Sequence, residues 1–385
     1  MLKAIFWLSL ILLIYVYIGY PLAARALASL RDKKVRKDAS HQPYVSILIA
    51  AYNEAADIEA TINNKLGQDY PSEKMEVLVI SDESEDGTDE IVQRIGKNAH
   101  CPVRLFRQVP RQGKTEGLNT LVPEASGEII LFSDANSQWD TEAVSKLCSN
   151  FADPKVGYVT GKMVYVNEDG SLVGDGCSAY MKYENWLREQ ETRMGSVVGV
   201  DGGIDAMRKS LYQPLRADQL PDFVQPLKVV EQGARVIYEP GALLKENALQ
   251  DAGHEFSMRV RVSLRALWAL KDMAHLMNPA SDPLFAFQLI SHKWLRYYGF
   301  VFMALFTLVT ITLADSGAIY TLAFIGLICV YGLAITAHGK AKSGKSLSPL
   351  LSIPYYFMLL NFSSLKAAQS YFRGEKKVIW KPRQG

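Results

Sequence analysis

Oxygen-bearing side chains directly follow three short apolar runs of this 385-residue sequence: Asn53, Glu54, Asp82, Asp134 and Asn136. Carboxylate and amide oxygens are the ligands that Mg²⁺ and Mn²⁺ prefer in proteins. A carboxylate can also accept a proton from a reacting hydroxyl. If the fold brings these groups together, they could hold a divalent cation and a polar ligand.

The elements that must position these side chains are predicted by two kinds of hydrophobic spacing. Strand-length runs alternate with segments of helical spacing, which predicts a parallel sheet with helices on both faces. The strands are expected at Tyr44–Ala51, Met75–Ile80, Val103–Phe106 and Glu128–Phe132, and the helices at Ala55–Leu66, Thr88–Ile95 and Thr115–Val122. Ligands of such sheets bind at the carboxyl ends of the strands.

An acidic residue after a strand often caps the next helix instead of binding a ligand, and Asp86 or Thr88 is expected to do so. Asp82 and Asp134 follow strands of the buried type, so a shared ligand crevice is favoured for them. Lys114 opens the third predicted helix, where it could reach a diphosphate beside the helix N-terminus. Taken alone, a solvent-exposed lysine is the simpler interpretation.

The usual phosphate-binding fingerprints are absent from the sequence. Neither GxGxxG after the first strand nor GxxxxGK[ST] occurs, which disfavours a dinucleotide oxidoreductase or a P-loop ATPase. The net charge of +2 also argues against a strongly basic nucleic-acid-binding chain. No nucleic-acid partner is therefore expected.

Three long apolar segments predict that a soluble domain is tied to a membrane. Residues 4–24 and 346–365 carry no charge, and residues 297–337 carry only Asp315. Basic residues cluster after the first segment, so the positive-inside bias places the N-terminus outside and the following domain in the cytoplasm. A cleaved signal peptide is the alternative, but the run is long and the basic cluster lies on its wrong side.

The two C-terminal apolar segments differ in character. Residues 297–337 are long enough for two spans with a tight turn at 314–317, and basic residues flank both ends. The last segment contains Pro349, Pro354 and Asn361, so a re-entrant or interfacial position is favoured over a full crossing.

The order of several short motifs resembles that of family 2 glycosyltransferases, in particular the membrane-bound, cellulose-synthase-like enzymes of bacterial polysaccharide pathways. The matching stretches are VSILIAAYNE (45–54), SD (81–82), GK (113–114), DAN (134–136), YMKYE (180–184), GVDGGIDAMR (199–208) and PDF (221–223). Any one of these is weak evidence, whereas their order is strong. The resemblance implies the α/β GT-A fold, a Rossmann-like sheet that binds nucleotide-diphospho-sugars, here with N- and C-terminal transmembrane helices and an interfacial amphipathic helix.

The resulting domain plan has six parts. It comprises an N-terminal transmembrane helix (4–24), a cytoplasmic GT-A domain (44–250), interfacial amphipathic helices (253–290), two transmembrane helices (297–337), a re-entrant or interfacial segment (346–372) and a basic cytoplasmic tail (373–385). The expected location is the inner (plasma) membrane, as a multi-pass protein with a cytoplasmic catalytic domain.

The resemblance also implies a role for each residue of the site. Nucleotide-sugar binding falls to Ala51, Tyr52, Glu54, Asp82, Lys114, Asp134 and Arg261, with Asp82 receiving the base, usually uracil. Asp134 and Asn136 would hold Mg²⁺ or Mn²⁺, and Asp201, Asp205 and Arg208 would bind the acceptor. A structural Asp in a glycine-rich turn is an alternative for Asp205.

Asp222 corresponds to the general base of the family, although Pro221 replaces the acid often found before it. The alternative is that Asp222 only caps the helix predicted at 223–232.

The sequence departs from the processive synthases in one motif. Where these enzymes carry QxxRW, this chain has MRVRV at 258–262, which keeps an arginine but loses the Gln and the Trp. For Arg261 we favour diphosphate binding, while Arg259 and Arg265 could equally face anionic lipid on an amphipathic helix at 256–273.

The expected reaction is a non-processive, inverting transfer from a UDP-sugar to a lipid-linked glycan at the cytoplasmic membrane face. Membrane lipids are expected as further partners. The alternatives are a processive β-polysaccharide synthase, a polyprenyl-phosphate sugar synthase and an inactive membrane scaffold.

Overall fold

The computed structural model describes residues 1–166, 176–247, 252–343 and 347–376. It divides into two compact units. The first, here called the sheet unit, comprises residues 31–166 and 188–247, and the second, the helical unit, comprises residues 1–30, 176–187 and 252–376. The predicted 44–250 domain is thus interrupted, because the first part of the helix after residue 175 belongs to the helical unit.

The sheet unit is built on one eight-stranded mixed sheet in the order β3-β2-β1-β4-β7-β6-β8-β5. Its strands are β1 (Val45–Ala51), β2 (Met75–Ser81), β3 (Val103–Arg107), β4 (Ile129–Asp134), β5 (Gln138–Trp139), β6 (Val156–Val166), β7 (Asp205–Arg208) and β8 (Arg235–Asn247). The first four are parallel, as predicted, and β7 runs antiparallel to β4. All four predicted strands therefore exist, within two residues of their expected ends.

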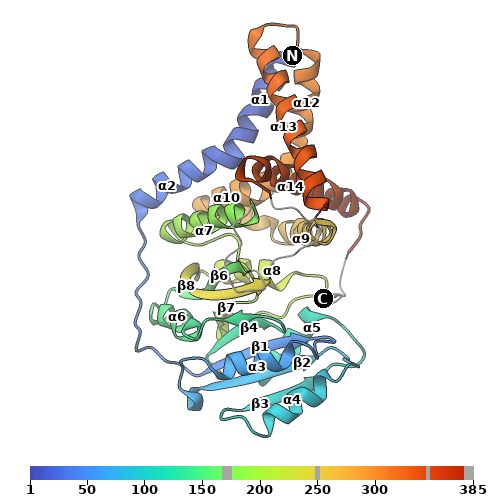
Figure 1. Ribbon diagram of the computed structural model, residues 1–385. Coiled ribbons are helices and arrows are strands. Elements are labelled where there is room, and N and C mark those ends of the chain that lie inside the picture. Colours follow the sequence, from blue (N-terminus) through green and yellow to red (C-terminus); the bar gives the residue numbers. More distant parts are fainter. Residues whose placement is uncertain (167–175, 248–251, 344–346, 377–385) are drawn as a thin grey trace. The chain divides into compact units, whose positions relative to one another are not determined.

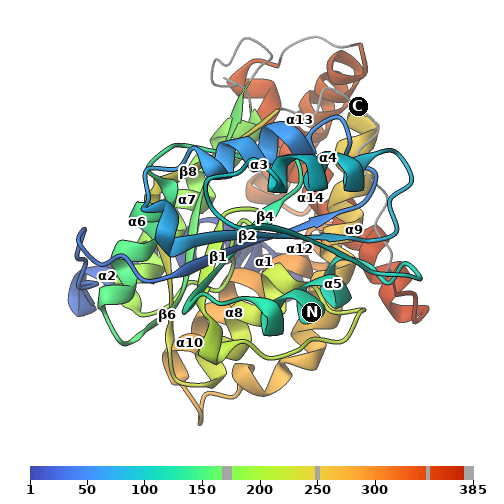
Figure 2. The ribbon, with the colours of Figure 1, turned by 90° about the horizontal axis from the view of Figure 1, so that it is seen from below.

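Alternate residues of the central strands enter two separate cores, as the period of a strand requires. Ile47 and Ile49 pack beneath α3 (Ile58–Leu66), α4 (Thr88–Gly96) and α6 (Ala143–Ser149). Leu48 packs against α5 (Lys114–Glu124) and α8 (Pro221–Glu231) on the opposite face. Figure 2 shows α3 and α4 on one side of β1 and β2, and α5 and α8 on the other. Both faces are covered, which explains why these strands are almost wholly apolar.

The helical unit contains the apolar segments (Figure 1). Its helices are α1 (Leu2–Ile14), η1 (Tyr15–Gly19), α2 (Tyr20–Arg31), α9 (Ala252–Asp272), η5 (Ala274–Met277), α10 (Pro283–Gln288), η6 (Leu289–Trp294), α11 (Leu295–Tyr297), α12 (Gly299–Thr312), α13 (Ala318–Lys342) and α14 (Pro349–Phe372); α7 (Gly176–Met194) begins here and ends in the sheet unit. Among the described residues, Leu2–Arg31 and Ala318–Lys342 are long and apolar enough to cross a membrane.

A bend lies at the start of the segment predicted to hold the two C-terminal spans. There the helical stretches Pro283–Tyr297 and Gly299–Thr312 meet at 56°. The basic residues before the bend are not simple solvent-exposed flanks. Arg296 lies 2.5 Å from the buried Glu184 carboxylate, and His292 lies 3.4 Å from it. The polar side chains at the bend therefore join α7 to the rest of the helical unit.

Candidate active site

The carboxyl ends of β1, β2 and β4 lie at one edge of the sheet. Strand register pairs Ala51 with Ser81 and Ala50 with Asp134, so the residues that follow these strands are neighbours. Beyond β1, Asn53 adopts a left-handed backbone conformation with φ 52°. The amide of Glu54 donates to the Thr88 hydroxyl at 2.9 Å. The turn that contains Ala51, Tyr52 and Glu54 is thus attached to the start of α4, and its contact with a nucleotide sugar stays a prediction.

Asp82 holds the loop that leads into α5. Its carboxylate accepts hydrogen bonds from Gln108 Nε2 (2.6 Å), Arg111 Nε (3.1 Å) and the amides of Gln112 (2.8 Å) and Gly113 (3.1 Å). These donors come from both side chains and backbone, and Asp82 is buried. A nucleobase that bonded to Asp82 would therefore have to share or displace them. Contact with the base stays a prediction, and anchoring of residues 108–113 is the role that the geometry supports directly.

Arg111 is a site residue that sequence reasoning missed. Its guanidinium lies over the Tyr52 ring, 3.3 Å from the centroid, while its Nε bonds to Asp82. A planar cation on an aromatic face is a strong attraction when it is partly desolvated. The only sequence signal was the place of Arg111 two residues before Gly113-Lys114.

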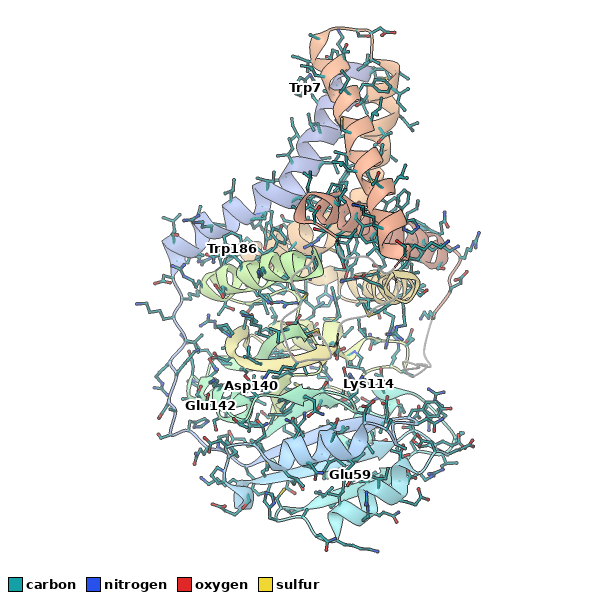
Figure 3. All side chains as sticks on the ribbon, viewed as in Figure 1. Trp7, Glu59, Lys114, Asp140, Glu142 and Trp186 are labelled. Atoms are coloured by element: carbon teal, nitrogen blue, oxygen red, sulfur yellow. The ribbon has the colours of Figure 1, made fainter. Side chains whose placement is uncertain are left out.

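Lys114, Asp134 and Asp222 form the charged centre of the site. Lys114 begins α5 (Figure 3), and its Nζ donates to Asp134 Oδ1 at 2.6 Å and lies 3.8 Å from Asp222 Oδ1. Burial alone would lower the pKa of Lys114, but the two carboxylates outweigh burial and raise it above its ordinary value. The lysine is therefore a permanent cation between two acids from separate parts of the chain.

Two glycines leave space beside these acids. A Cβ on Gly202 would lie 2.9 Å from Asp222 Oδ2, and one on Gly203 would lie 3.2 Å from Asp134 Oδ2. Both glycines have positive φ, 73° and 72°, which other residues rarely adopt. The glycine pair therefore lets a loop pass directly against both carboxylates.

Asp205 lies in the strand that follows this loop and is fully buried. Burial, with a smaller contribution from nearby Asp222, raises its pKa to about 7, although the hydroxyls of Thr160 and Tyr158 lower it in part. A buried carboxyl of this kind is neutral in the folded protein at acid pH. The geometry allows electrostatic communication with Asp222, whereas direct binding of an acceptor stays a prediction.

We expect Asp205→Asn to change how stability depends on pH. A group whose pKa is raised by folding favours the folded state at low pH, and that contribution is lost as the pH rises from about 4 to about 7. Between pH 5 and pH 8 the wild type should therefore lose about 3 kcal/mol of unfolding free energy that the variant keeps. Urea unfolding of the full chain in detergent measures this difference; parallel pH profiles would contradict it.

Two predicted acceptor-binding residues have structural partners instead. The Asp201 side chain is 5% exposed, lies 2.6 Å from Arg188 Nη2 and accepts a bond from the Met163 amide, which favours a role in the fold. Arg208 pairs with Ile129 at the opposite end of β4 from Asp134. Its guanidinium donates to the carbonyls of residues 151, 153 and 156. We therefore correct the prediction for Arg208, which lies at the wrong edge of the sheet for the site.

Arg261 belongs to the helical unit, on α9, where its side chain is half-buried. Its contact with a diphosphate stays a prediction. Asp222 is in the first turn of α8, whose N-cap is Leu220, so the alternative of helix capping by the Asp222 side chain receives no support.

The oxygen ligands fit a divalent cation that is shared with a bound ligand. Asp134 and Asn136 are both partly exposed in one turn, and Gly203 leaves space beside Asp134. Within the described residues no group of three or more His, Cys, Asp or Glu side chains could hold a metal. A ligand such as a diphosphate would have to supply the remaining oxygens.

The sequence matches the family "Glycosyl transferase family 2" over residues 46–215. It is 28% identical over 266 residues to the poly-beta-1,6-N-acetyl-D-glucosamine synthase of Staphylococcus aureus (strain COL), covering 65% of this chain and 62% of that protein. It is 30% identical over 169 residues to the beta-monoglucosyldiacylglycerol synthase of Trichormus variabilis, covering 43% and 36%. The chain thus matches less than two thirds of the length of these relatives.

A solved structure supports the fold. The mannosyltransferase PcManGT from Pyrobaculum calidifontis, in complex with GDP-Man and Mn²⁺, superposes with a TM-score of 0.76, at 23% identity, over 97% of this chain and 100% of that one. The sheet, the ordered motifs and the family match agree over the same residues. Residues 46–215 thus match family 2 glycosyltransferases, and the chain shares the GT-A fold of the solved mannosyltransferase.

Proposed function

We propose that this protein transfers a sugar, with inversion, from a UDP-sugar to a hydroxyl of a lipid-linked glycan at the cytoplasmic face of the inner membrane. The observation that carries the proposal is the Lys114–Asp134–Asp222 cluster at the carboxyl ends of the parallel strands. It offers a cation for a diphosphate and a carboxylate for a hydroxyl within one small volume. These are the two functions that sugar transfer from a nucleotide diphosphate requires.

Asp222 is the proposed general base. Its carboxylate accepts the proton of the acceptor hydroxyl as that oxygen attacks the anomeric carbon, and the bond from this carbon to the diphosphate oxygen breaks. Attack from the face opposite the leaving group inverts the configuration. Gly202 bears on this assignment because a Cβ at this position would lie 2.9 Å from Asp222 Oδ2, so a larger residue there would displace the proposed base.

Lys114 is the proposed partner of the leaving diphosphate. It stands at the first position of an eleven-residue helix, where helix amides and the ammonium both favour an anion. Asp134 and Asn136 would hold Mg²⁺ or Mn²⁺. When bound, such a cation neutralises charge that develops on the leaving diphosphate.

The acceptor class is proposed from the apolar helices and the named relatives. Helices fit to cross a membrane share the chain with the catalytic unit, which suits an acceptor that carries a lipid. One relative is named for synthesis of a polysaccharide and another for synthesis of a glycolipid. Loss of the QxxRW pattern at 258–262 supports a single transfer over repeated addition.

A donor screen tests the proposed function. The full chain in detergent, with a membrane lipid extract, is expected to release UDP from one UDP-sugar only when Mg²⁺ or Mn²⁺ is present. The lipid product should carry one added sugar, with its anomeric configuration opposite to that of the donor. A ladder of long products would overturn single transfer, and release of GDP alone would overturn the choice of UDP.

A further inference from the structure

Three side chains on one face of the sheet form a compact cluster under the Asp134 turn (residues 134–137). The cluster, here called the clamp, consists of Asn64 and Lys65 at the end of α3 and Trp139 in β5. Lys65 is fully buried, an unusual place for a lysine, and Trp139 is 3% exposed. Neither residue was expected from the sequence to take part in the site.

Asn64 and Lys65 hold the backbone that follows the metal ligands. Asn64 pairs with both main-chain groups of Trp139, since its Nδ2 donates to the carbonyl and its Oδ1 accepts from the amide, each at 2.9 Å. Lys65 Nζ donates to the carbonyl of Ser137 at 2.7 Å and to Asn64 Oδ1 at 3.0 Å. It also lies 4.1 Å from the centroid of the Trp139 ring. Both of these hydrogen bonds end at the Asp134 turn or at Asn64, which anchors Trp139.

Trp139 extends the same network to the Gly202–Gly203 loop, which lies beside the proposed general base Asp222. Its indole Nε1 donates to the carbonyl of Gly203 at 2.8 Å. Gly203 and Gly202 are the residues that lie directly against Asp134 and Asp222. The Trp139 side chain therefore bonds to the Gly202–Gly203 loop, which borders both Asp134 and Asp222. The Trp139 backbone directly follows the Asp134 turn.

We propose that the clamp of Asn64, Lys65 and Trp139 positions the Asp134 turn and the Gly202–Gly203 loop, and so fixes the geometry between Asp134 and Asp222. The inference rests on the proposed function, because it assumes that both acids act in one reaction. The clamp is argued to act through the Asp134 turn and the Gly202–Gly203 loop, so its members are positioning residues. Small displacements of reacting groups are costly, up to about a hundredfold in rate for 1 Å.

Trp139→Phe and Lys65→Met test the proposal in the full chain. Trp139→Phe keeps an aromatic ring but removes the bond to Gly203, and Lys65→Met keeps most of the side-chain volume but removes the bond to Ser137. We expect kcat to fall ten- to a hundredfold in each at saturating donor and Mn²⁺, with the KM for the donor within about twofold. The matched control is Asn150→Leu, which removes buried bonds to Lys146 and Glu239 on the same face, away from the Asp134 turn.

Hydrogen exchange of the ligand-free chain provides a readout that needs no transfer reaction. Amide protection should fall in residues 134–139 for Lys65→Met, and in residues 134–139 and 202–204 for Trp139→Phe, but in neither segment for Asn150→Leu. Wild-type turnover and protection in the two clamp variants, or equal losses in the control, would overturn the proposal. If the donor screen found no transfer, the exchange pattern would still decide whether the clamp holds the two loops.

Discussion

Replacing Asp222 with Asn is expected to lower kcat by roughly a thousandfold, within the range that removal of a general base produces. The amide keeps the size of the side chain but cannot take the proton of the acceptor hydroxyl at neutral pH. Donor binding should change little, because Lys114 and Asp134, the proposed partners of the diphosphate and the metal, are both retained. The measurement is UDP release at saturating donor and acceptor, together with the dissociation constant for UDP in the presence of Mn²⁺.

Asp218→Asn is the matched control for Asp222→Asn. Asp218 lies four residues earlier and accepts a bond from Arg216 at 3.1 Å, so the control changes one charge of the same segment without touching the proposed centre. Its rate should stay within about twofold of the wild type. An Asp222→Asn enzyme that remained fully active would favour a bare lipid phosphate as the acceptor, because a phosphate needs no base to attack.

The parallel half of the sheet could be predicted because local pattern and tertiary environment agree there. The runs at 45–51, 75–81 and 129–134 are apolar on both faces, as strands between two helical layers must be. Asp82 and Asp134 lie at one edge of the sheet because β2 and β4, which carry them at their carboxyl ends, both pair in parallel with β1. That consequence follows from topology, and no knowledge of side-chain packing was required.

The remaining part of the site depends on contacts between distant segments, and no periodic pattern in the sequence predicts such contacts. Whether Arg208 faces the site or the opposite edge is set by the antiparallel register of β7 against β4, which pairs it with Ile129. Lys65 occupies a helical position like any solvated lysine, and only the buried carbonyl of Ser137 distinguishes it. The paired role of Asp201 likewise needs Arg188, thirteen residues earlier and on a different element.

Replacing Lys114 with Met is expected to move two measured quantities in opposite directions. Transfer should fall by roughly a hundredfold, because the ammonium no longer compensates charge on the leaving diphosphate. Binding of Mn²⁺ to the ligand-free chain should become about tenfold tighter, because the ammonium that lies 2.6 Å from Asp134 and 3.8 Å from Asp222 competes with a metal for these acids.

Rate measurements and electron paramagnetic resonance titration of Mn²⁺ follow the two effects of Lys114→Met separately. Lys146→Met serves as the control, since this lysine pairs with the exposed Glu142 on α6 and should leave both quantities unchanged. A merely structural role for Lys114 would weaken transfer and metal binding together, since a disordered cluster serves neither. Weaker transfer together with tighter Mn²⁺ binding therefore indicates that Lys114 and the cation use the same carboxylate. We then expect the diphosphate of the donor to release Asp134 from Lys114 when the donor binds.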